Sequence, residues 1–130
     1  MYFVITLLVS TLGGWDATLK VLVTMAIIDY LTGVIAAGLN GQLKSKIGFK
    51  GITKKVMLFL LVAAATQADV IMGTNSAIRE ATLFFFIGNE LLSLLENAGR
   101  MGIPLPSALT NAVEILCGKQ KQEEKKGDVE

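Results

Sequence analysis

The sequence contains no histidine and only one cysteine, Cys117, among its 130 residues. The chain therefore lacks the usual ligand sets for zinc and cannot close an internal disulfide. Charged residues are also scarce, at 18% of the chain, compared with about 25% in ordinary soluble domains. The net charge of only +1 gives no broad basic field, which argues against a nucleic-acid partner.

Apolar residues, in contrast, make up 52% of the chain, and the mean hydropathy is +0.58. Crossing a hydrocarbon core about 30 Å thick takes roughly 20 predominantly apolar residues. Three windows approach that length, at about residues 17–39, 56–73 and 77–98. We therefore predict an all-α fold, in which residues 1–118 form a single membrane domain built on a bundle of about three transmembrane helices.

The N-terminal segment, residues 1–12, is apolar but too short to cross a membrane alone. It has neither a basic start nor an A-x-A-like cleavage site, so we expect it to stay in the mature protein rather than to be a signal peptide. Two glycines follow it, and Trp15 beside Asp16 is typical of an interfacial anchor. An amphipathic or re-entrant segment is expected, with a fourth span as the alternative.

After the third window, Pro104 and Pro106 interrupt the helical pattern. Apolar residues then recur at helical spacing, which predicts a short amphipathic helix over residues 107–117, on the membrane or beneath the bundle. Residues 119–130 are almost entirely charged, Gln or Gly, with four lysines and four acids. Such a segment has nothing to bury, so we predict a disordered cytoplasmic tail.

The connection between the first two windows carries an excess of lysine and no acid: Lys44, Lys46, Lys50, Lys54 and Lys55. Loops rich in Lys and Arg stay on the cytoplasmic side of membranes, so we expect this loop to be cytoplasmic. With three spans, the turn at residues 73–75 is then external, the N-terminus external and the C-terminus cytoplasmic.

The third window has one polar face. At 100° per residue, nine positions fall within an arc of about 120°, and only Phe86 among them is apolar. The nine are Arg79, Thr82, Phe86, Asn89, Glu90, Ser93, Glu96, Asn97 and Arg100. The opposite face, which includes Leu83, Leu91, Leu94 and Leu95, is expected to meet lipid.

A charge inside a span costs about 2.5–3.5 kcal/mol, so this polar face must meet protein or water. Two interpretations remain open: hydrogen bonding between packed helices, or the lining of an aqueous path in an oligomer. The number of polar positions favours the second in at least one state. The expected pore or oligomer face consists of Asn89, Glu90, Ser93, Glu96 and Asn97.

The other two windows each contain one acid, Asp29 near the middle of the first and Asp69 near the external end of the second. Burial disfavours a charged carboxylate, so each should be protonated or paired. Arg79 is a possible partner for Asp69, whereas no cation is expected at the depth of Asp29 or Glu90. Small residues beside Asp29 indicate close helix packing, namely Thr32, Gly33, Ala36 and Ala37.

Paired carboxylates can in principle carry acid–base catalysis. No nucleophile–histidine arrangement, phosphate-binding loop or cluster of metal ligands accompanies them. We therefore predict that the chain is not an enzyme and uses no cofactor.

Several motifs occur in a specific order: D-Y-L-T-G-V-I-A-A at 29–37, G-I-T-K-K at 51–55, N-E-L-L-S-L-L-E-N at 89–97 and G-I-P-L-P at 102–106. Lys44-Ser45, Gly48, Asp69 and Arg79 lie between them at matching positions. Over about residues 29–109 the chain resembles the toxin-secretion/phage-lysis holins of the clostridial- and Bacillus-phage type. The long apolar start before Trp15 departs from that pattern.

This resemblance implies a protein without catalytic residues that forms homo-oligomers in the bacterial cytoplasmic membrane. Such proteins permeabilise the membrane at a set time, so that an endolysin reaches the cell wall or a large protein is exported. The alternatives are an antiholin or membrane adaptor that regulates a separate pore former, and a small channel or transporter subunit.

Overall fold

A computed structural model describes residues 1–109, 111–112 and 115 of the chain. These residues contain four α-helices, α1 (Tyr2–Thr11), α2 (Ala17–Leu39), α3 (Ser45–Met72) and α4 (Ala77–Arg100), and they contain no strand. The predicted all-α fold is confirmed for this part of the chain.

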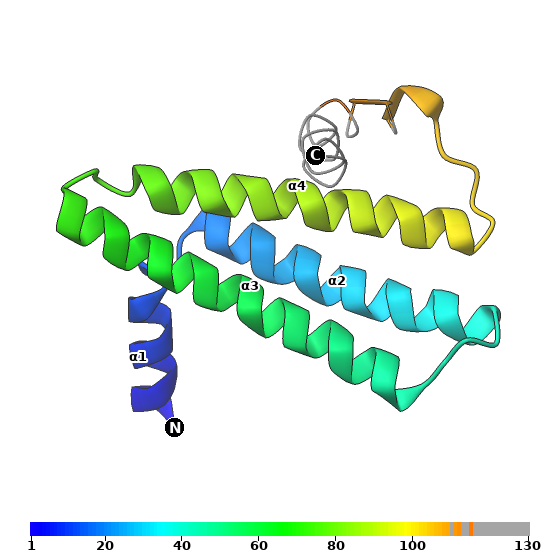
Figure 1. Cartoon of the computed structure of the whole chain (residues 1–130), viewed down its shortest axis with the longest axis horizontal. Helices are drawn as coiled ribbons and strands as arrows, with labels where there is room; N and C mark the ends of the chain where they lie inside the picture. Colours follow the sequence, from blue (N-terminus) through cyan, green and yellow to red (C-terminus); the bar gives the residue numbers. More distant parts are fainter. Residues whose placement is uncertain (110, 113–114, 116–130) are drawn as a thin grey trace, which may run out of the picture.

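Helices α2, α3 and α4 alternate in direction and form one elongated bundle (Figure 1). Helix α4 packs along both others, while α2 and α3 touch each other more sparsely. We call the end of the bundle that contains residues 12–17 and 72–77 the turn end. The opposite end, with residues 39–46 and 100–103, is the lysine end. Near the turn end, helix α1 projects away from the bundle at a steep angle rather than running along it.

Local sequence signals explain the helix limits at the turn end. Asp16 is the N-cap of α2, and its Oδ1 accepts the backbone N–H of Leu19 at 2.9 Å. Gly73 ends α3 in the left-handed conformation, with φ of 65°. The connection to α4 is therefore only four residues long, and it brings the end of α3 next to the start of α4.

The buried apolar core lies toward the turn end of the bundle and consists of Leu19, Leu22, Leu58, Val62 and Leu83. The outer faces of α2 and α3 are also apolar but exposed. Ile27 and Leu31 of α2 and Leu60 of α3 each expose more than half of their surface. Continuous apolar surface of this kind is typical of contact with lipid or with another chain.

Two of the helices, α2 and α3, are long and apolar enough to cross a membrane. Helix α2 coincides with the first predicted window, residues 17–39. Helix α4 covers the predicted window 77–98, but its polar face makes it less hydrophobic, so a third span stays a prediction. 

The predicted loop over residues 40–55 is wrong for most of its length, because α3 already begins at Ser45. Its 28 residues extend about 42 Å, well beyond a hydrocarbon core of about 30 Å. Lysine is a good helix former and the segment has no proline, so the lysines occupy the first turns of α3.

At the C-terminal side, Ser107–Leu109 are helical. The predicted helix over 107–117 continues into positions 110, 113–114 and 116–117, which lie outside the described residues. The predicted tail, residues 119–130, lies entirely outside them.

Candidate functional site

A buried ion-pair cluster joins the three helices of the bundle. The Nζ atom of Lys55, on α3, lies 2.8 Å from Asp29 Oδ2 on α2 and 2.7 Å from Glu90 Oε2 on α4. The three side chains expose only 19%, 10% and 9% of their surface, respectively. One ammonium group therefore faces two carboxylates from two different helices. 

Asn97 completes this arrangement, which we call the Lys55 cluster (Asp29, Lys55, Glu90 and Asn97). Its amide Nδ2 donates to Asp29 Oδ1 at 2.9 Å and to the Asp29 carbonyl oxygen at 3.1 Å. The same nitrogen lies 3.1 Å from Thr32 Oγ1. Both carboxylate oxygens of Asp29 thus have a donor, which satisfies a group that would otherwise be costly to bury.

The residues predicted for helix packing border this cluster. Ala36 and Ala37 are buried, and Thr32 and Gly33 are half-buried. A Cβ atom at Gly33 would lie 3.5 Å from Asn97 Nδ2, so Gly33 faces the Asn97 side chain directly. Small residues here let α2 and α4 approach closely enough for Asn97 to reach the backbone of α2.

The expectation that no cation lies at the depth of Asp29 and Glu90 is wrong, because Lys55 occupies that position. The other four lysines, Lys44, Lys46, Lys50 and Lys54, are exposed. A signal for this difference exists in the sequence. Lys55 precedes Leu58 and Val62 by three and seven residues, which places it on the buried face of α3.

At the turn end, Asp69 of α3 caps the start of α4. Its Oδ1 accepts the backbone N–H of Ile78 at 2.9 Å, and its Oδ2 accepts that of Arg79 at 2.7 Å. The hydroxyl of Thr74 donates to the same carboxylate. The unpaired amides at a helix N-terminus favour such an anion. Asp69 therefore contacts Arg79 through the backbone, whereas the predicted partner was the side chain.

The guanidinium group of Arg79 instead holds the linker between α1 and α2. Its Nε donates to the Leu12 carbonyl at 2.6 Å, and one terminal nitrogen donates to the Gly14 carbonyl at 3.2 Å. The other lies 2.7 Å from Asp16 Oδ2 and 3.0 Å from Glu80 Oε1. We call this set the Arg79 clamp (Leu12, Gly14, Asp16 and Arg79). Only 2% of Arg79 is exposed.

Two further observations show how closely the Arg79 clamp fits. The hydrogen bonds from Arg79 hold the pKa of the Asp16 carboxyl below its ordinary value. A Cβ atom at Gly13 would collide with Nε and Cδ of Arg79, and Gly13 also has φ of 90°. Glycine is therefore required at this position for two separate reasons. No local sequence pattern predicted the contacts of the Arg79 clamp.

The rest of the predicted polar face is less buried. Asn89 and Ser93 are half-buried, and Glu96 and Arg100 are exposed. Leu83 and Leu95, which were expected to face lipid, are buried instead. Within the described part of the chain, every buried side-chain nitrogen or oxygen has a hydrogen-bond partner. In a single chain, most of the deep polar groups thus serve the packing of α4 against its neighbours.

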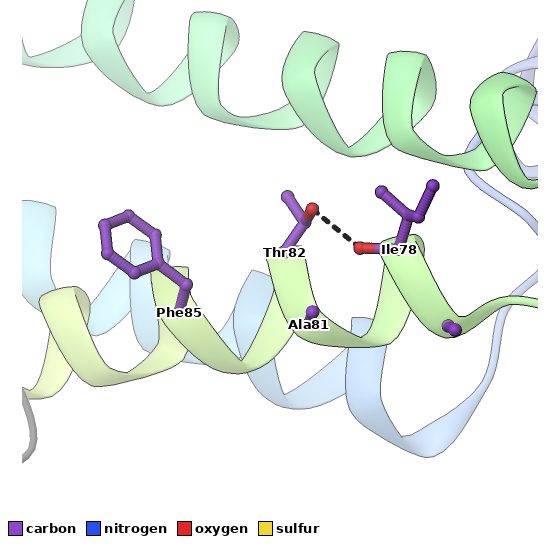
Figure 2. A pocket seen from close by; sticks show the side chains of 5 residues that line it. Ile78, Ala81, Thr82 and Phe85 are labelled. Carbon is purple, nitrogen blue, oxygen red and sulfur yellow. Dashed lines mark hydrogen bonds between the residues drawn. The ribbon is translucent and has the colours of Figure 1, made fainter.

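A shallow hollow of about 560 Å³ lies along the first turns of α4 and is lined by Ala77, Ile78, Ala81, Thr82 and Phe85. Figure 2 shows the side chains of these residues. Its one hydroxyl, that of Thr82, already donates to the Ile78 carbonyl at 2.8 Å. The lining therefore presents no free reactive group to a ligand. Among the described residues, no three His, Cys, Asp or Glu side chains come together as a metal site.

These features define a class: a helical membrane protein whose bundle is joined by buried charges. Residues 6–118 match the model of the bacteriophage holin family, and the chain belongs to that family. The resemblance inferred from the motifs is thereby confirmed. No solved structure matches the chain.

Similar proteins occur in bacteria and in a phage. An uncharacterized protein of Listeria innocua is 47% identical over 116 residues, covering 89% of this chain and 83% of the relative. A protein of Clostridium perfringens, encoded in the nagH 3′ region, is 35% identical over 88% of each chain. A probable holin of Bacillus phage phi105 is 34% identical over 85% of this chain and 82% of its own length.

Proposed function

We propose that the chain is a phage-type holin that accumulates as homo-oligomers in the bacterial cytoplasmic membrane and permeabilises it at a set time. The opened membrane would let an endolysin, or a large exported protein, leave the cytoplasm. The observation that carries this proposal is the Lys55 cluster, a set of ion pairs inside a bundle whose outer faces are apolar. Family membership supports the same function.

In the closed state, we propose, α4 turns Glu90 and Asn97 toward α2 and α3 and the exposed Phe84 and Phe85 toward lipid. Opening would separate α4 from one neighbour, so that Asn89, Glu90, Ser93, Glu96 and Asn97 meet water inside an oligomer. Breaking a buried ion pair costs about 3–5 kcal/mol, which would make spontaneous opening rare. Water and polar groups of neighbouring copies would compensate for that cost once enough copies are assembled.

The proposed topology has three spans, with the lysine end in the cytoplasm and the turn end outside. The length of α3 supports it, because the exposed Lys46, Lys50 and Lys54 extend past the hydrocarbon core toward one side. The C-terminus would then be cytoplasmic. A single cysteine at position 46, in a Cys117→Ser background, should resist an impermeant thiol reagent in intact spheroplasts. Its labelling before lysis would contradict this topology.

The central test is expression of the chain in bacteria with and without a co-expressed endolysin. We expect an abrupt loss of viability at a reproducible time, and rapid lysis only when the endolysin is present. Glu90→Ala should abolish or shift that time while the protein still accumulates, whereas Leu94→Ala should change it less. Equal timing for both variants would show that the polar face of α4 is not the functional surface.

An antiholin or membrane adaptor is the second candidate, favoured by one observation. The buried polar groups of the described residues are all paired within a single chain, so folding requires no second copy. The same experiment separates these functions. A chain that is harmless alone but delays lysis by a co-expressed holin would be an antiholin. A channel subunit would pass ions without releasing a cytoplasmic enzyme.

A further inference from the structure

Helix α1 has hydroxyls as its only polar side-chain groups, and almost no protein surrounds it. None of its residues is buried, and Tyr2, Phe3 and Leu8 expose 87%, 78% and 58% of their surface. It carries no charged side chain. The hydroxyls of Thr6 and Thr11 donate to backbone carbonyls of the same helix, at 2.8 and 2.7 Å. These two hydroxyls are therefore satisfied without water.

The direction of α1 differs from that of the other helices. Figure 1 shows it projecting from the bundle near the turn end, at a steep angle and with the N-terminus pointing away, and it touches α3. The last turn of α3 is also strongly exposed and apolar, with Val70 at 73%, Ile71 at 87% and Met72 at 66%. Helix α1 and this turn are thus two exposed apolar segments near the turn end.

The Arg79 clamp fixes this direction. The linker contains two adjacent glycines, which alone would leave α1 free to turn. Arg79 removes that freedom, because it bonds to the carbonyls of Leu12 and Gly14 and to the carboxylate of Asp16 at once. The angle between α1 and the bundle is therefore fixed by hydrogen bonds within the folded chain.

We propose that α1 lies in the plane of the membrane, buried among the acyl chains of the leaflet at the turn end, with Arg79 as its positioning residue. A helix of 10 residues is about 15 Å long and too short to cross. Lipid covers a helix on all sides, whereas a partner helix covers only one stripe, and exposed apolar side chains occupy more than half of the circumference of α1. Trp15, 55% exposed, then sits near the headgroups.

In the proposed topology this is the outer leaflet, and only that detail rests on the proposed function. The placement of α1 in lipid can be measured without lysis, so the two proposals fail separately. The consequence for the molecule is a fixed depth: an in-plane helix attached to α4 through Arg79 prevents the bundle from sliding along the membrane normal.

The test places single spin labels at positions 4, 5, 6 and 7, which follow one another at about 100° and so surround α1, in full-length protein carrying Cys117→Ser. The protein is reconstituted in vesicles of phosphatidylethanolamine and phosphatidylglycerol. Label depth is obtained from collision rates with oxygen and with a water-soluble nickel complex. We expect all four labels to be accessible to oxygen and protected from the nickel complex. Their depths should rise and fall with the helical period of about 3.6 residues and should not change steadily along the chain.

Three results would overturn the proposal. A depth that changes steadily by about 1.5 Å per residue would mean that α1 inserts along the membrane normal. Strong nickel collisions would place α1 in water. Labels that are immobilised, and that broaden one another between copies, would mean that a second chain covers α1.

The positioning role of Arg79 has its own test. Arg79→Gln should scatter the four depths and shift the quenching of Trp15, the only tryptophan, by brominated lipids. Glu80→Gln, which alters a neighbour of the guanidinium without touching the linker, should leave both unchanged. If Arg79→Gln does not accumulate, Asp16→Asn removes the charged partner alone and should scatter the depths less. Unaltered depths in the accumulated variants would contradict the role of Arg79.

Discussion

The two buried cations of the bundle are held in different ways. Lys55 is surrounded by side chains from two other helices, with two carboxylates for one positive charge. Arg79 bonds to two backbone carbonyls as well as to Asp16, and its own backbone N–H is held by Asp69. Lys55 thus joins three helices through side-chain contacts. Arg79 joins the α1–α2 linker to the start of α4, mainly through main-chain contacts.

This difference separates a part of the bundle that can rearrange from a part that stays fixed. The Lys55 cluster can exchange its partners for water or a neighbouring chain without breaking any helix, because its contacts are mainly between side chains. Releasing Arg79 would instead leave carbonyls of the linker unpaired. The apolar core also lies toward the turn end. We therefore expect helices to separate first at the lysine end.

The largest effect is expected from Lys55→Met, which leaves Asp29 and Glu90 buried beside each other without a cation. Removing one partner of a buried pair costs about 3–5 kcal/mol. We expect a clear loss of melting temperature in detergent and lower accumulation in the membrane. Lys54→Met, at the exposed neighbouring position, is the matched control. Adding Asp29→Asn and Glu90→Gln to Lys55→Met should restore much of the loss, and equal melting of the two single variants would contradict the role of the Lys55 cluster.

Gly13→Ala tests the Arg79 clamp, with Gly14→Ala as its control. Both glycines have positive φ, so each alanine costs about 1–2 kcal/mol in the backbone. Only at Gly13 does the new methyl group collide with Arg79, while Gly14 has open space. Overpacking adds about 1–3 kcal/mol. Gly13→Ala should therefore melt at a lower temperature than Gly14→Ala. Identical melting would mean that the Arg79 side chain adapts without cost.

Asp69→Asn should have a smaller effect, because the amide keeps one acceptor for the start of α4. The second oxygen is replaced by an NH₂ group that cannot accept from a backbone N–H. Losing a cap costs about 0.5–2 kcal/mol. Unfolding in detergent should reveal this loss, and Gln67→Ala, at an exposed position of the same helix, should be neutral. A loss for Asp69→Asn no greater than that of the control would show that Asp69 contributes nothing as a cap.

The smallest effect concerns the pH dependence of stability through Asp16. Its pKa is lowered in the folded chain by hydrogen bonds from Arg79, so the stabilisation is fully present above the unfolded pKa, near 4. It is lost as the pH falls toward the folded pKa. Because the side chain is 45% exposed, solvent weakens the effect. Between pH 6 and 3 the wild-type chain should lose slightly more stability than Asp16→Asn, whereas parallel curves would exclude this linkage.

Much of the fold could be predicted because lipid imposes simple rules on sequence. Helix α2 is a mostly apolar run with a capping Asp16 before it, so its limits are visible. The buried position of Lys55 was not predicted, because all five lysines of residues 40–55 were assigned to one loop. Its spacing from Leu58 and Val62 distinguishes it from the four exposed lysines. The Arg79 clamp joins residues 63 to 67 positions apart. The residues around Gly13 and around Arg79 in the sequence give no indication of such a contact.

The position of Arg79 in the chain also sets an order of assembly. The partners of its guanidinium in the linker leave the ribosome first, together with α1, whereas Arg79 follows only after α2 and α3 have been made. Until then, two glycines leave α1 without a fixed direction. Helix α1 is thus synthesised before α2, α3 and α4 but oriented after them. It reaches its final position only once α4 has folded against the bundle.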